Sequence, residues 1–127
     1  MWFWKKKRKI EKLTVPEVKF VGEQDGSNER HLKDKLTVVF GRERSINRAY
    51  LAQAIYHNSN GAVEVVLALK ATNQSDARIA AGVAEVLREI APANVHLDIV
   101  FLSETMEQDL SKVCRPFYEL TGGQIFA

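Results

Sequence analysis

The sequence predicts one α+β domain, and two periodic segments carry most of this prediction. Residues 62–71 alternate between apolar and more polar side chains, the period of two expected of a strand with one covered face. Residues 75–91 repeat apolar side chains at the spacing of a helix. The length of 127 residues suits a single core, and 46% hydrophobic and 27% charged residues are typical of a globular protein.

The first predicted elements are a strand and a helix. Residues 17–21 form a short apolar strand that stops at Gly22, and the polar loop GEQDGSN follows. Ser27 or Asn28 is the expected N-cap of a helix that ends near Gly41. Its apolar positions share one face: Leu32, Leu36, Val39 and Phe40.

A hairpin is predicted next, from two strand-like runs at residues 46–56 and 62–71 that are joined by the polar loop HNSNG. In the second strand, one set of side chains is expected to face the helices: Val63, Val65, Leu67 and Leu69. The alternate set belongs to an open face, on which Glu64 and Lys70 contact water.

The last three predicted elements are a helix, a strand and a second helix. The helix covers residues 75–91, with Pro92 as its stop, and the strand covers residues 95–102. A shorter helix covers residues 103–113, and its expected inner side chains are Met106, Leu110 and Val113.

The resulting order is βαββαβ followed by a C-terminal helix. Two right-handed crossovers in this order predict a four-stranded antiparallel sheet with both crossover helices on one face, as in ferredoxin-like domains. The expected domain covers residues 13–127, preceded by a basic aromatic segment at residues 1–12.

Residues 1–12 concentrate positive charge. They carry six basic residues and one acidic residue, a net charge of +5, which leaves −3 for the rest of the chain, whose total is +2. A solvated or docked tail is favoured over weak contact with an anionic membrane, and membrane contact is favoured over nucleic acid. The residues for such a contact are Trp2, Trp4, Lys5, Lys6, Lys7, Arg8 and Lys9.

Motifs of known chemistry are missing from the sequence. The single cysteine, Cys114, has no CxxC partner and no histidine at a motif-like spacing, and the sequence has no GxSxG, HExxH or phosphate-binding glycine loop. We therefore expect no enzyme, no cofactor and no metal site. Three features predict a cytoplasmic protein: the lone cysteine, the absence of a signal sequence and the absence of a long apolar run.

Three groups of residues are candidate sites. Arg48, Tyr50 and Tyr56 alternate along one strand and form a candidate protein-binding patch, with ordinary strand residues as the preferred alternative. Two further candidates are weaker. Glu64, His96 and Asp98 share a sheet face, but a ferredoxin-like order separates their strands by about 10 Å, too far for one metal. The loop GEQDGSN could present helix amides to the carboxylate of an amino acid, although a plain connecting loop is favoured.

Three stretches resemble the C-terminal domain of the bacterial enhanced-serine-sensitivity protein SseB. They are RAYLAQAIYHNSNGAVEVVLAL, VHLDIVFL and the closing KVCRPFYEL, within a likeness that covers roughly residues 17–120. The chain is similar to the C-terminal domain alone, without the domain that precedes it in that family. The resemblance implies an interaction or regulatory domain and assigns no functional residues.

These observations lead to one functional hypothesis and one alternative. The hypothesis is a non-enzymatic bacterial protein-interaction or regulatory domain, of which an immunity-type inhibitor is one variant. The expected partner is a protein of unknown identity or a second copy in a homo-oligomer. The alternative is a regulatory domain that senses a small amino acid.

Overall fold

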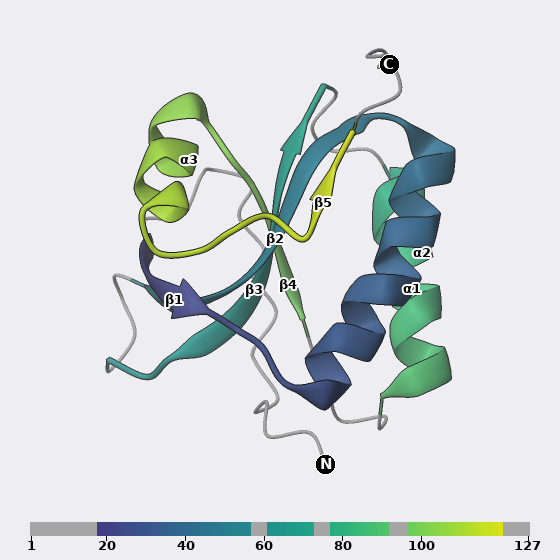
Figure 1. Ribbon diagram of the computed structural model, residues 1–127, viewed down its shortest axis with the longest axis horizontal. Coiled ribbons are helices and arrows are strands. Elements are labelled where there is room, and N and C mark those ends of the chain that lie inside the picture. Colours follow the sequence, from purple (N-terminus) through teal and green to yellow (C-terminus); the bar gives the residue numbers. More distant parts are fainter. Residues whose placement is uncertain (1–17, 57–60, 73–76, 92–96, 121–127) are drawn as a thin grey trace.

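The computed structural model describes residues 18–56, 61–72, 77–91 and 97–120 and has three layers. A mixed five-stranded sheet lies in the middle, with helices α1 and α2 on one face and helix α3 on the other (Figure 1). The α+β prediction is confirmed. The predicted two-layer arrangement, with one face open to water, is wrong because α3 covers that face.

The described elements follow the predicted order and add a final short strand. They are β1 (Val18–Glu23), α1 (Ser27–Glu43), β2 (Ile46–Tyr56), β3 (Glu64–Ala71), α2 (Ala77–Ile90), β4 (Asp98–Phe101), α3 (Glu104–Ser111) and β5 (Tyr118–Glu119). Among the described residues, no helix has the length and apolar character of a transmembrane span.

The strand order is β1-β2-β3-β4, and β5 pairs with β2 beyond the end of β1. All pairs are antiparallel except β3 and β4, which are parallel. The predicted four-stranded antiparallel sheet is therefore corrected to a mixed sheet of five strands. The predicted ferredoxin-like order is not found, since β1 lies beside β2 and not between β3 and β4.

The directions in which the two connecting helices take the chain explain this topology. The 17 residues of α1 span about 25 Å, which carries the chain from the end of β1 to the far end of the sheet. β2 then runs back along β1 as its antiparallel neighbour. α2 instead returns the chain to the end at which β3 began, and a helical crossover of this kind joins parallel strands.

A large apolar core lies between the sheet and the two helices α1 and α2. Leu32, Leu36 and Phe40 of α1 are fully buried there, as the helical period predicts. The register predicted for β3 is confirmed for Leu67, Leu69 and the partly buried Val65. Val63 lies before the strand and is 53% exposed, so its predicted burial is wrong.

A second core lies under α3. Its sheet side consists of small and aromatic side chains, and Leu110 of α3 and Cys114 close it from above. Met106 packs against its rim, but Val113 is 41% exposed because the helix ends at Ser111, which corrects the predicted inner position of Val113. The sheet residues of this core are Phe20, Tyr50, Ala52, Ala54, Tyr56, Val66, Ala68 and Val100.

The C-terminal part of the described chain adds β5 and an aromatic cluster. Phe117 and Tyr118 pack on Phe40, with ring centroids 6.4 and 5.7 Å away. The hydroxyl of Tyr118 donates a hydrogen bond to the carbonyl oxygen of Phe40 at 3.3 Å. The closing PFY therefore holds the last turns of α1 against the sheet.

Candidate functional site

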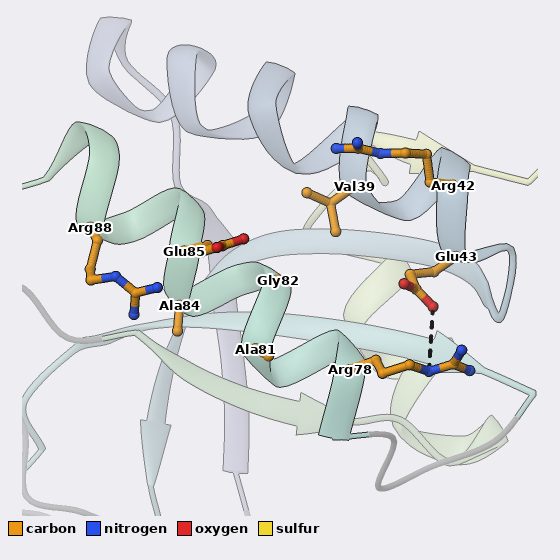
Figure 2. A pocket seen from close by; sticks show the side chains of 9 residues that line it. All are labelled: Val39, Arg42, Glu43, Arg78, Ala81, Gly82, Ala84, Glu85 and Arg88. Carbon is orange, nitrogen blue, oxygen red and sulfur yellow. Dashed lines mark ion pairs between the residues drawn. The ribbon is translucent and has the colours of Figure 1, made fainter.

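A groove of about 520 Å³ runs along the solvent side of α1 and α2 (Figure 2). Its wall on α1 consists of Val39, Arg42 and Glu43. Its other wall is the outer surface of α2, where small residues alternate with charged ones: Arg78, Ala81, Gly82, Ala84, Glu85 and Arg88. Small residues therefore line the base of the groove, and five charged side chains lie along its rim.

The two helices are in close contact at Gly82. A Cβ atom at this position would lie 2.9 Å from Cγ1 of Val39, so only glycine fits without a shift. At one end of the groove, Nε of Arg78 lies 3.8 Å from Oε1 of Glu43, an ion pair drawn as a dashed line in Figure 2. The Arg78 side chain is 75% exposed, so this pair is solvated and contributes little to stability.

The groove residues were not among the predicted sites. The sequence contains one signal for them, because Ala77, Ala81 and Ala84 lie opposite the buried stripe of α2 and are exposed. These solvent-facing alanines form a stripe of small side chains on the outer surface of α2.

Of the three predicted interaction residues, Tyr50 and Tyr56 are buried beneath α3, and Arg48 is partly exposed. Arg48 and Tyr50 both bind the carboxylate of Glu107 on α3: the guanidinium donates to Oε1 at 2.9 Å and again to Oε2, and the Tyr50 hydroxyl donates to Oε2 at 2.7 Å. Tyr50 and Tyr56 are almost completely buried. A role for these residues in partner binding stays a prediction, and Arg48, with 38% of its side chain exposed, keeps the most surface for it.

The charges in this cluster support one another. The hydrogen bond from Arg48 lowers the pKa of Glu107, and the same bond raises the pKa of Arg48. Burial, together with the hydrogen bond to Glu107, raises the pKa of Tyr50 to about 12. Glu107 is therefore an ionised anchor for α3, 57 and 59 residues away in sequence from its partners.

Tyr56 and Asp98 form a second buried pair, in which the hydroxyl donates to Oδ2 at 3.1 Å. Burial raises the pKa of Tyr56. The sheet order brings Glu64 near this pair, because Asp98 on β4 is in register with Val66 on the adjacent β3. The expected separation of these strands is thus wrong, yet no group of three potential metal ligands occurs within the described parts of the chain, which do not include His96.

The predicted amino-acid-binding loop places a carboxylate of its own at the start of α1. Gly26, and not Ser27 or Asn28, occupies the N-cap position, with φ at +152°. Glu29 folds back over it: a Cβ atom on Gly26 would lie 2.5 Å from Oε1 of Glu29. Oε2 of Glu29 accepts a hydrogen bond from Gln24 at 2.7 Å, so the Glu29 carboxylate lies where a ligand carboxylate was expected.

Cys114 is buried beneath α3, with its Sγ 3.6 Å from the carbonyl oxygen of Leu51. Burial raises the pKa of this thiol to about 11, so at neutral pH it is protonated and a poor nucleophile.

The predicted contact residues of the N-terminal segment, from Trp2 to Lys9, lie outside the described residues.

Comparison with known proteins agrees with the resemblance noted in the sequence. A family model for the SseB protein C-terminal domain matches residues 26–119, which include every described helix and four of the five strands. Neither a curated protein nor a solved structure matches the chain significantly. The match extends over well over half of the chain, and the chain therefore belongs to the SseB C-terminal domain family.

Proposed function

We propose that the chain is a non-enzymatic protein-interaction or regulatory domain whose contact surface is the groove between α1 and α2. Membership of the SseB C-terminal domain family supports an interaction role, since the sequence motifs of that resemblance are structural and carry no reactive group. An immunity-type inhibitor, which blocks another protein by covering it, is one form that such a role can take.

One contrast carries this proposal. The side chains that most resemble reactive groups are used inside the fold: Glu107 anchors Arg48, Asp98 accepts from Tyr56, and the Cys114 thiol is buried. The groove residues are different, because Arg42, Glu85 and Arg88 extend into solvent around a floor of small side chains. Arginine beside small residues provides both a charged anchor and room for a close approach.

The amino-acid-sensing alternative has less support. The start of α1, where a ligand carboxylate would gain from the helix amides, lies against the carboxylate of Glu29. A ligand would have to displace this side chain and the hydrogen bond from Gln24, at an energetic cost.

Matched tryptophan variants test the proposed surface. Ala81→Trp fills the groove at an exposed position of α2. Gln108→Trp is the control, because it adds the same side chain at an exposed position of α3, on the opposite face of the sheet. Wild type and both variants are used as bait in native lysate, and each retained protein is identified by mass spectrometry, purified and titrated against the three baits. We expect binding that is lost in Ala81→Trp and kept in Gln108→Trp. Partners that bind Ala81→Trp as tightly as wild type would exclude the groove as the contact surface.

A further inference from the structure

We propose that the groove receives helix α2 of a second copy of this chain, so that two domains associate through antiparallel α2 helices about a two-fold axis. This inference rests on the groove as an interaction surface and names its occupant.

The outward face of α2 has the spacing of a helix-pairing seam. Ala77, Ala81, Ala84 and Arg88 follow one another at intervals of four, three and four residues, and all four are exposed. This is the spacing of the core positions of paired helices. Three of the four are alanines, and small side chains at such positions let two helix axes approach to about 8 Å, the lower end of the usual range.

The charges beside this seam are self-complementary. Arg78 and Glu85 each follow a seam alanine by one residue and are seven residues apart, so they lie on the same flank of the helix. An antiparallel partner reverses their order. A two-fold axis near Ala81 then brings Arg78 close to Glu85 of the second copy, and Glu85 close to Arg78 of the second copy.

A two-fold axis uses the same pairing twice, as an isologous dimer requires. In a parallel arrangement the two copies of this flank would lie on opposite sides of the interface, so Arg78 and Glu85 could not pair. The ion pair of Arg78 with Glu43 does not compete with this pairing, because the guanidinium has five donors and this side chain is 75% exposed. α2 is also electrically balanced, with Arg78 and Arg88 against Glu85 and Glu89, so two copies do not repel each other.

The groove adds a second wall to this contact. A helix that lies over Ala81 and Ala84 also faces Val39 and Arg42 of α1, so each α2 is held between two helices of the other copy. One helix in one groove buries less than the roughly 800 Å² per partner of a standard interface. We therefore expect weak association, with a dissociation constant on the order of 100 µM.

Sedimentation of the purified full-length chain, from about 10 µM to about 1 mM, tests the dimer. Arg78→Glu and Glu85→Arg each place like charges at both symmetric contacts and are expected to weaken the dimer roughly tenfold. The double variant R78E/E85R exchanges the two charges and is expected to recover wild-type association. Lys112→Glu, an exposed charge reversal at the end of α3, is the control and should leave association unchanged. Circular dichroism melts identify any variant that fails to fold.

Each outcome decides the proposal. A wild type that sediments as a monomer throughout the range overturns it, as does a dimer that the single variants leave intact or that R78E/E85R fails to restore. If the chain is monomeric but Ala81→Trp still abolishes binding of a purified partner, only the choice of a second copy is wrong and the proposed interaction surface stands. If the groove variants change neither self-association nor the binding of a purified partner, both proposals fail.

Discussion

The two faces of the sheet are covered by different means. Under α1 and α2, helices of 17 and 14 residues place buried leucine, isoleucine, valine and phenylalanine side chains on the sheet. Under α3, a helix of 8 residues covers a surface of alanine, tyrosine and valine, and Glu107 binds Arg48 and Tyr50. A short helix buries little apolar area, and charge-assisted hydrogen bonds then fix its position.

The same leucine deletion on the two faces should give the largest difference. Leu67→Ala and Leu110→Ala each remove a fully buried side chain, and such changes cost about 2–5 kcal/mol of unfolding free energy. Leu67 lies in the core that α1 and α2 cover, and a shift of these long helices to fill the cavity would disturb many other buried side chains, so we expect the upper half of this range. Leu110 lies on a short helix over alanines and can shift inward, so we expect the lower half. Urea denaturation measures both, and an equal loss would show that the α3 layer is as rigid as the other.

Removing the charge of Glu107 should have a smaller effect, confined to the α3 face. Glu107→Gln keeps the size of the side chain but weakens the bonds from Arg48 and Tyr50, and we expect a loss of about 1–2 kcal/mol, because Arg48 is partly exposed. Urea denaturation at neutral pH measures it.

The pH dependence of stability separates this charge effect from a packing effect. The folded-state pKa of Glu107 is lowered, so its stabilisation is fully present above the ordinary glutamate pKa, about 4.3, and is lost as the pH falls through the lower folded value. Wild type should therefore lose more stability than Glu107→Gln below about pH 4.3. Glu104→Gln, at an exposed position of the same helix, is the control and should keep the wild-type profile. Parallel profiles for wild type and Glu107→Gln would contradict the proposed anchor.

The smallest expected effect tests the contact between α1 and α2, for which α3 has no counterpart among the described helices. Gly82→Ala gains helix propensity, worth about 1 kcal/mol, but its Cβ meets Val39 at 2.9 Å, and overpacking costs about 1–3 kcal/mol. We expect a net loss of about 1 kcal/mol. In a Val39→Ala background the same change should stabilise the protein by about 0.5–1 kcal/mol. Thermal melts of the four proteins in this cycle measure the coupling, and additive effects would mean that the helices can move apart freely.

The sequence predicts the larger face better than the smaller one. Leu32, Leu36 and Phe40 repeat with the helical period, and Leu67 and Leu69 with the strand period, so burial can be read from local spacing. The strand order cannot be read in this way, because a period of two indicates which side chains share a face but not which strand is the neighbour. The mixed sheet depends on the end of the sheet to which each of α1 and α2 takes the chain.

The sheet face beneath α3 did leave a signal in the sequence. Val66 and Ala68 occupy the side of β3 that was assigned to water, although neither is polar, and Ala52 and Ala54 continue this surface on β2. The Glu107 cluster left none, because its members are distant in sequence and each is common on an exposed strand or helix. β5, with two residues, is too short for any period. The groove is similarly hidden, since it needs two helices side by side and the sequence describes each helix alone.

The position of β5 also affects how the chain folds as it leaves the ribosome. β2 is complete once Tyr56 has been made, but part of its outer edge pairs with Tyr118 and Glu119, and Phe40 is covered by Phe117 and Tyr118. At about 5–20 residues per second, more than sixty residues take several seconds to follow. During this interval β2 has an unpaired edge beside an incompletely covered aromatic ring, and we expect the nascent domain to be most prone to aggregation then.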